Sequence, residues 1–248
     1  MSEDIYDELA EAQGLTVIRG TGSGIVPSMA RLDGPSFSPP QLDPRIRDFY
    51  ERTSQYELDL TGETQPLSRP FLWVLVNTVG KSLNQLSLPI RGGGEAGRGH
   101  KVISEIVELV DRAGRVQLTG WSRKDAQAKD ASYIAFYDVV TPPGHDSPCI
   151  KTMFPVPRGS VTVLLRPKLA NGRFYLESDG KNYGEAGWYL ILQRADGTLK
   201  VAQLGWFGAS FEVQADEDGH LWCHQVVRVF GCSILKFRYR MVRKSGVV

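Results

Sequence analysis

Apolar and polar residues alternate along most of the chain from residue 101 onward, with the period of two that is typical of β-strands. Segments rich in Gly, Pro, Asn and Asp separate the alternating runs, and no helical pattern lies between them. Successive antiparallel hairpins commonly close on themselves, because closure removes exposed strand edges. The sequence therefore predicts a mainly β fold, an antiparallel and roughly ten-stranded barrel or strongly curled sheet with a few N-terminal helices packed on it or capping it. The predicted strands are 101–110, 115–122, 131–140, 149–154, 160–166, 173–178, 187–194, 199–206, 209–214, 220–230 and 233–243.

The N-terminal part of the chain has a different pattern. Residues 4–12 favour a short helix, and residues 31–43 form a loop rich in Pro, Gly and Ser. Asp43 and Pro44 suit the cap and the first turn of a second helix near 44–52. On this basis residues 1–43 form an arm, and residues 44–248 form a single barrel-like domain.

Residues 70–85 are apolar on nearly every side. A helix with this composition is buried, and the segment is too short to span a bilayer. We expect it to act as a plug or lid against one end of the barrel. The alternative is a contact with a second copy of the chain, which would make a homodimer, or with a membrane surface.

Four short stretches are distinctive by their exact sequence rather than by the alternation of apolar and polar residues. They are GIVPSMARLDGPSF at 24–37, DPRIRDFYERTSQYELDL at 43–60, QLSLPI at 85–90, and Trp121 followed two residues later by Arg123. They resemble a group of uncharacterised actinobacterial proteins, and the resemblance covers most of the chain. The resemblance implies a bacterial background rich in secondary metabolism, and it assigns no activity and no catalytic residue.

Charge and composition exclude several classes of protein. The 248 residues carry 29 Lys and Arg against 28 Asp and Glu, without a basic block that would mark a nucleic-acid surface. No apolar run approaches the ~20 residues of a membrane span, and the acidic N-terminus is not a signal peptide. The four His and three Cys show no metal-ligand spacing. We therefore expect a reduced, cytoplasmic protein without a metal or an organic cofactor.

The last long hairpin, residues 221–242, offers the densest group of candidate residues. A two-residue turn at Gly231 and Cys232 would place His224 opposite Tyr239. His can shuttle protons and Arg can hold an anion; the alternative is a structural ion pair beside a hydrogen-bonded core His. The face of the hairpin that we expect to be buried carries Trp222, His224, Arg228, Phe237 and Tyr239.

Two acidic residues are further candidates for acid/base chemistry. With a turn at 111–114, Glu105 is the only charge on one face of its hairpin and lies opposite Gly120. A desolvated carboxyl would suit a general acid or base; alternatively, Glu105 lies at the rim and pairs with a cation. Asp138 near the end of an apolar strand is the second candidate, or else a cap for the turn that follows.

Aromatic and amide side chains complete the predicted site. Tyr133 and Tyr137 share a face of their strand, and a turn at Asp196 and Gly197 would place Trp188 on the same face as Gln203. The residues expected to contact a substrate are Tyr133, Tyr137, Trp188, Gln203, Trp222 and Phe237.

Two functions require the same apolar cavity. The first is a cofactor-independent cyclase or isomerase that holds an apolar, polyketide-like substrate by shape and assists with acid/base groups. The second is a non-catalytic, lipocalin-like carrier for a hydrophobic ligand. A third function, from another class, is an interaction protein whose Trp and Phe surface binds a partner. For the enzyme, the predicted catalytic residues are Glu105, Asp138, His224, Arg228 and Tyr239.

Overall fold

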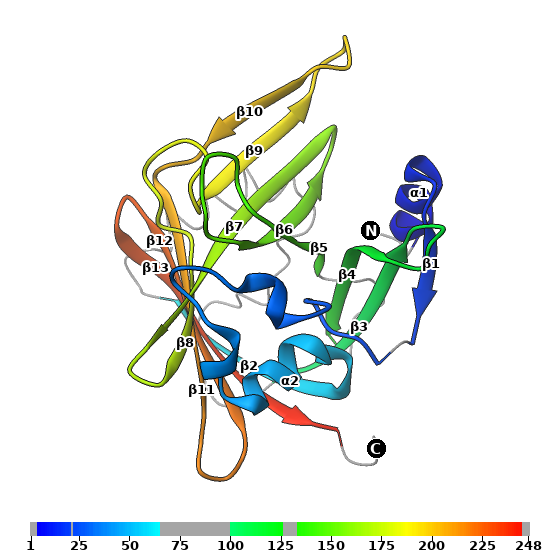
Figure 1. The fold of residues 1–248 in the computed structure, drawn as a ribbon. Helices are drawn as coiled ribbons and strands as arrows, with labels where there is room; N and C mark the ends of the chain where they lie inside the picture. Colours follow the sequence, from blue (N-terminus) through cyan, green and yellow to red (C-terminus); the bar gives the residue numbers. More distant parts are fainter. Residues whose placement is uncertain (1–3, 21, 65–99, 126–132, 245–248) are drawn as a thin grey trace.

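A single antiparallel sheet of 13 strands makes up most of the computed structural model (Figure 1). The structure describes residues 4–20, 22–64, 100–125 and 133–244. The chain is therefore mainly β, as its alternating pattern predicts. The predicted lid helix at 70–85 lies outside the described residues.

The helices all lie in the N-terminal part of the described chain. They are α1 (Asp4–Gln13), α2 (Pro44–Glu51) and the short 3-10 helices η1 (Met29–Leu32), η2 (Pro39–Gln41) and η3 (Thr53–Gln55). The strands are β1 (Thr16–Arg19), β2 (Tyr56–Thr64), β3 (His100–Val110), β4 (Val116–Asp125), β5 (Tyr133–Val140), β6 (Cys149–Val156), β7 (Gly159–Ala170), β8 (Arg173–Glu177), β9 (Trp188–Gln193), β10 (Leu199–Gln203), β11 (Phe207–Ala215), β12 (Leu221–Val229) and β13 (Cys232–Arg243).

The sheet curls until its two ends approach each other. Its strands follow the order β10-β9-β7-β6-β5-β4-β3-β2-β13-β12-β11-β8, and β8 also pairs with the second half of β7. The first half of β7 pairs instead with β9. Strands β9 and β10 form a hairpin that projects from the rest of the sheet (Figure 1). The strands form a strongly curled sheet and not a closed barrel.

Residues 25–56 fill one end of the space inside the curl. In Figure 1 they lie between β3 on one side and β8 and β11 on the other. Met29 and Ile46 are buried there, in the same core cluster as Phe174 of β8. The helix α2 begins where predicted, because the Asp43 carboxylate accepts a hydrogen bond from Arg45 N at 2.8 Å. The segment therefore makes up part of the main core.

The helix predicted at 4–12 is observed as α1, and it packs on the outer face of the sheet. Tyr6 of α1 is fully buried, with its ring centroid 5.5 Å from that of Phe136 in β5. Gly120 of β4 leaves the room that this ring needs, since a Cβ there would come within 2.2 Å of Tyr6 Cε1. Together these contacts form a second, smaller core outside the curl.

The turn of the β12–β13 hairpin lies one residue earlier than the sequence predicts. Phe230 and Gly231 form it, with φ values of 49° and 77°, so that Val229 pairs with Cys232. Positive φ at both central residues is the geometry of a type I′ turn, whose twist matches that of the flanking strands. A register shift follows at once, between Val227 and its neighbour.

This register shift, and not the displaced turn, reverses the faces of β12 relative to the prediction. Cys223 and Gln225 face the core, opposite Tyr239 and Phe237, whereas His224 lies on the outer face. The core-facing residues predicted for β13 are confirmed and those predicted for β12 are wrong. The physical reason is that a shift of one residue moves every side chain of a strand to the other face.

The β9–β10 hairpin also differs from the prediction. Its loop contains three residues, 195–197, and is closed by a hydrogen bond between the residues on either side. Gln203 therefore pairs with Tyr189, and Trp188 lies on the opposite face of the hairpin. The predicted shared face of Trp188 and Gln203 is wrong for the same reason of register.

Candidate binding site

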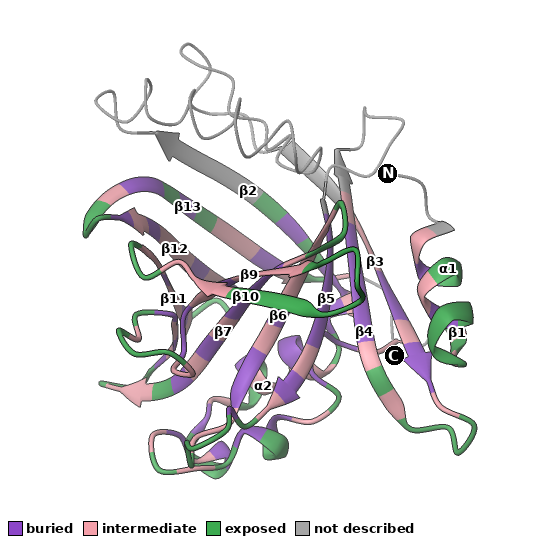
Figure 2. Ribbon diagram, turned by 90° about the horizontal axis from the view of Figure 1, so that it is seen from above, coloured by how far each residue is buried: buried purple, intermediate pink, exposed green. Residues whose placement is uncertain are grey.

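The inner face of β4, β5 and β6 presents a row of buried polar side chains. These strands lie side by side (Figure 2), and cross-strand pairing places Thr119 opposite Tyr137, and Tyr137 opposite Thr152. Trp121 shares this face of β4, with its ring centroid 5.9 Å from that of Tyr137. Each of the four residues is buried. We refer to Thr119, Trp121, Tyr137 and Thr152 as the polar wall.

Several polar atoms at this wall have no hydrogen-bond partner in the part of the chain that the structure describes. They are Thr119 Oγ1, Trp121 Nε1 and Thr152 Oγ1, together with Ser104 Oγ of the neighbouring β3. A buried polar atom left unpaired costs about 1–3 kcal/mol, and such atoms are few in native proteins. Their concentration on one wall marks a place where a polar group of another molecule can be bound.

Arg123 brings a positive charge to the same inner face. Its guanidinium carbon stands 4.0 Å from the centroid of the Trp121 ring, which is a cation–π distance. Burial raises the pKa of Cys223 on the facing wall to about 12, and the charge of Arg123 offsets part of this rise. Cys223 is therefore a neutral thiol at pH 7, without the thiolate character of a nucleophile.

The facing wall, formed by β11, β12 and β13, is not completely covered. The Tyr239 hydroxyl donates to Gln225 Oε1 at 2.7 Å, and both side chains stay half-buried. Phe211 and Trp188 also pack against the core while keeping part of their surface exposed. These side chains therefore lie on the inner face and keep part of their surface exposed.

A line of neighbouring aromatic rings leads from this face to the surface of the molecule. Ring centroids are separated by 5.3 Å between Trp188 and Phe207, and by 4.2 Å between Phe207 and Trp206. The Trp206 ring stacks in turn on Phe230, at 5.4 Å. Trp206 is 39% exposed and Phe230 is 73% exposed. We call Trp206, Phe207 and Phe230 the aromatic edge.

Both predicted acidic residues pair with arginines away from the polar wall. Glu105 Oε1 lies 3.3 Å from Arg19 Nη1 of β1. A three-residue turn and an extra residue in β4, Gln117, together place Glu105 opposite Ser122 instead of the predicted glycine. Asp138 Oδ1 accepts a hydrogen bond from Arg31 Nη2 at 3.3 Å. The contact of Glu105 matches its structural alternative, a carboxylate that pairs with a cation. Asp138 also pairs with a cation, whereas its predicted alternative was to cap the turn that follows.

The predicted cluster of His224, Arg228 and Tyr239 is not assembled. His224 lies on the outer face of β12, between Glu212 and an arginine of the adjacent strands. Arg228 donates from Nη1 to Ser210 Oγ at 2.9 Å. Tyr239 faces inward, and the register shift within the hairpin separates it from the other two.

The predicted substrate-binding residues divide between the two faces. Trp222 lies outside, where the guanidinium carbon of Arg238 is 4.0 Å from its ring centroid. Gln203 donates to two backbone carbonyls of the loop 178–187 and so holds that loop in place. Of Tyr133 the structure describes the backbone only. The residues placed on the inner face are Tyr137, Trp188 and Phe237.

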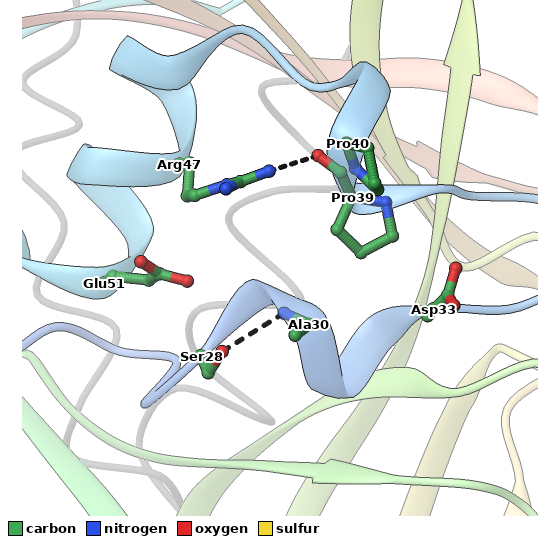
Figure 3. Close-up of a pocket in the computed structure, with 7 residues that line it drawn as sticks. All are labelled: Ser28, Ala30, Asp33, Pro39, Pro40, Arg47 and Glu51. Atoms are coloured by element: carbon green, nitrogen blue, oxygen red, sulfur yellow. Dashed lines mark hydrogen bonds between the residues drawn. The ribbon is translucent and has the colours of Figure 1, made fainter.

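A surface pocket of about 470 Å³ lies between η1, η2 and α2 (Figure 3). Its charged side chains hold the N-terminal segment together. Arg47 donates to the Pro39 carbonyl, and Glu51 Oε1 accepts a hydrogen bond from Met29 N at 2.7 Å. Because both charges already serve the fold, this pocket is a weaker candidate than the concave face.

Three side chains in the β11–β12 turn lie close enough to share a cation. One ligand atom from each of Asp216, Asp218 and His220 lies within 4.8 Å of the others. However, the Asp216 carboxylate already accepts hydrogen bonds from Trp222 Nε1 at 2.9 Å and from His220 N at 2.7 Å. The grouping is explained by the turn that these contacts stabilise.

Comparison with known proteins identifies a distant relative. The chain is 24% identical, over 220 residues and 88% of its length, to the uncharacterized membrane protein YndJ of Bacillus subtilis (strain 168). It spans 38% of the length of that protein. No family model matches the chain, and no solved structure matches it. Within the described residues, no helix has the length and apolar character needed to cross a membrane.

The sequence reasoning missed the polar wall, apart from Tyr137. Ser and Thr are ordinary residues in alternating strands and give no signal by themselves. A usable signal is present in β4, where Thr119, Trp121 and Arg123 alternate and so share a face. Whether that face lines the inside of the curl depends on how the whole sheet bends.

Proposed function

We propose that this chain is a non-catalytic binding protein that holds an apolar ligand with a polar end on the concave face of its sheet. The observation that carries the proposal is the presence, on one surface, of half-exposed aromatic side chains and of buried polar atoms without partners among the described residues. Phe211 and Trp188 are placed to contact an apolar chain, and the polar wall to receive its polar end.

The positions of the charged groups favour binding over catalysis. Of the predicted catalytic residues, Glu105, Asp138, His224 and Arg228 lie on the outer face or pair at the rim of the sheet. Tyr239 faces inward, and its hydroxyl is bonded to a glutamine. A cyclase or isomerase acting on a polyketide-like substrate stays a prediction, because the residues predicted as its acid/base groups are not brought together on the inner face.

The name of the relative guides the choice of ligand. YndJ is described as a membrane protein, and a domain that works beside a bilayer encounters lipids more often than other apolar molecules. We therefore propose a lipid-like amphiphile, with a long apolar chain and a small polar group, as the class of ligand.

Native mass spectrometry of the protein purified from its own source tests this proposal first. We expect an apolar molecule of a few hundred daltons to remain bound under native conditions and to be absent from a denatured sample. If the purified protein carries no bound ligand, titration with oleate tests the same proposal. A protein that retains no such molecule and binds no oleate would contradict the proposal.

A variant locates the ligand on the concave face. Phe211→Ala should weaken oleate binding at least about tenfold, because it removes an apolar contact of about 1.5–3 kcal/mol. The matched control is Trp222→Ala, which removes a larger aromatic side chain from the outer face and should leave the dissociation constant unchanged. Equal weakening by both variants would place the ligand elsewhere.

The aromatic edge supports a second role, which is contact with a bilayer surface. Phe230 occupies a turn position with φ of 49°, which type I′ turns normally fill with Asn, Asp or Gly. The turn therefore does not explain a phenylalanine that is 73% exposed. Trp and Phe side chains insert into the interfacial region of membranes. We propose that the aromatic edge touches the bilayer from which the ligand enters.

Co-sedimentation with vesicles of phosphatidylcholine and phosphatidylglycerol tests this second role. Phe230→Asn should reduce the bound fraction severalfold, and it should also raise the stability of the fold, since Asn adopts positive φ more easily than Phe. Leu199→Asn is the control, because Leu199 is 65% exposed and lies outside the aromatic edge. Unchanged vesicle binding by Phe230→Asn would rule out the contact.

A further inference from the structure

The outer edge of β10 has no partner strand in the part of the chain that the structure describes. Strand β10 stands at one end of the strand order and pairs only with β9, in a hairpin that projects from the rest of the sheet (Figure 1). Its sequence, LKVAQ, contains one lysine and no proline, and its register with β9 is continuous, without a bulge. The edge therefore has little of the protection that sheets use against pairing with another strand.

The hydrogen bonds of the hairpin show which backbone groups of β10 point outward. At the two ends of the strand, Thr198 O accepts from Arg194 N, and Leu204 N donates to Trp188 O. Pairs with and without hydrogen bonds alternate along an antiparallel ladder, so the even-numbered residues of β10 bond to β9. The odd-numbered residues direct their N–H and C=O groups to the outer edge, and they are Leu199, Val201 and Gln203.

Exposed apolar side chains lie beside these backbone groups. Leu199 is 65% exposed and Val201 is 39% exposed, and the alternation of a strand places both on one face of β10. Tyr183 is also exposed beside this face, because its ring centroid lies 6.0 Å from that of Tyr189, the cross-strand partner of Gln203. Apolar surface next to unpaired backbone groups is the combination that favours the addition of a strand.

We propose that β10 pairs antiparallel with β10 of a second copy of this chain, about a two-fold axis at Val201. The outward backbone groups are centred on this residue, so that Val201 lies opposite Val201 of the second copy, and Leu199 opposite Gln203 of the second copy. The central pair and both outer pairs can each exchange two backbone hydrogen bonds. A two-fold contact of this kind closes on itself and leaves no edge of β10 for a third copy. The inference does not depend on the proposed ligand.

Lys200 favours this register over the adjacent one. It is the charged residue of β10, and it lies on the face opposite to that of Val201. In the register centred on Val201, Lys200 is opposite Ala202 of the second copy. A register centred on Lys200 would place two lysines directly opposite each other, which is destabilising. The charge of the edge is therefore compatible with pairing to a second copy and selects its alignment.

Sedimentation equilibrium over a range of protein concentrations tests whether the dimer forms. We expect wild type to show a reversible monomer–dimer equilibrium, because a contact between two five-residue strands is small. A wild type that stays monomeric up to about 1 mM overturns the proposal.

Proline substitutions separate the outer edge of β10 from its inner edge. Val201→Pro removes an outward N–H, which an edge strand tolerates, so its melting temperature should stay near that of wild type. Its dimer dissociation constant should rise about tenfold or more, because central hydrogen bonds are lost. The matched control, Ala202→Pro, removes an N–H that bonds to β9 and should lower the melting temperature. If Val201→Pro dimerises as tightly as wild type, the contact lies on another surface and the proposal is wrong.

A pair of charge variants tests the two-fold symmetry without proline. Val201→Lys and Val201→Glu each place like charges opposite each other, so either variant alone should be monomeric. An equimolar mixture, with one variant carrying a fluorescent label, should form mixed dimers. Lys200→Glu is the control and should dimerise nearly as wild type does, because this position faces an alanine of the second copy. A mixture that does not associate, or a single variant that dimerises like wild type, contradicts the pairing of Val201 with itself.

Discussion

Asp48 joins three parts of the fold through one carboxylate. It lies in α2 and accepts hydrogen bonds from the Tyr56 hydroxyl, at 2.7 Å, and from Arg52, while Arg243 of β13 approaches to 3.7 Å. Burial by itself would raise the pKa of Asp48, but the hydrogen bonds from Tyr56 and Arg52 outweigh it and hold the pKa below its usual value. The ionised carboxylate therefore helps to dock the N-terminal segment on the sheet.

The lowered pKa of Asp48 predicts a dependence of stability on pH. The folded pKa lies below the unfolded value of about 3.9, so the stabilisation is present above about pH 4 and is lost as the pH falls through the folded value. Asp48→Asn should lower the free energy of unfolding at pH 7 by about 1–3 kcal/mol. Urea denaturation at pH 7 and pH 3 should show this difference shrinking at the lower pH.

The control for Asp48 is Glu217→Gln, at an exposed position in the β11–β12 turn. It should change the free energy of unfolding little at either pH. A difference between wild type and Asp48→Asn that stays constant from pH 7 to pH 3 would mean that the carboxylate is not ionised in the way its contacts imply.

Phe230 illustrates why single residues of the candidate site escaped prediction. A bulky residue with positive φ is rare, so the local sequence favours a turn at the next two residues. In the folded chain Phe230 stacks on Trp206, at 5.4 Å, and the turn forms around it. That contact joins two turns that are distant in the sequence, so the preferences of the local sequence for a turn do not predict it.

At the scale of elements, α1 depends on the absence of one side chain. Its Tyr6 ring occupies the space above Gly120, where a Cβ would come within 2.2 Å of Tyr6 Cε1. Tyr6 is fully buried between the helix and the sheet. The smaller core therefore requires glycine at this position of β4.

Substitution of this glycine tests how α1 is attached. Gly120→Ala should lower the free energy of unfolding by about 1–3 kcal/mol, because the added methyl group forces the Tyr6 ring, and α1 with it, away from the sheet. Gly205→Ala is the matched control, since a Cβ there meets no atom within 4 Å. Equal midpoints of urea denaturation for the two variants would contradict this packing.

The hairpins show which properties of an element can be predicted from its own residues. Alternation located the strands β12 and β13 correctly, because the pleat of a strand repeats every two residues. It did not determine which face of β12 is buried, since the residues on both sides of that strand include apolar and polar types. The register shift after Val227 decides this, and His224 and Arg228 therefore lie outside while Cys223 and Gln225 lie inside.

At the scale of the whole molecule, the curl determines what the inner face can do. The strand order brings β4 to β6 across from β11 to β13, so that Arg123 influences the pKa of Cys223 on the facing wall. Residues 25–56 occupy one end of the enclosed space, as Figure 1 shows. Trp121 and Tyr137 of the polar wall belong to the same core cluster as this segment.

By itself, the sequence determined that the chain is mainly β and antiparallel, with short helices at α1 and α2. These properties depend on local periodicity and on caps such as Asp43, which act over a few residues. Only the tertiary structure decided that the sheet curls without closing, that the N-terminal segment enters its core, and that Thr119, Trp121 and Thr152 share a wall. The physical reason is that faces and neighbours depend on turn register and on contacts between residues distant in the chain, where a shift of one position reverses the outcome.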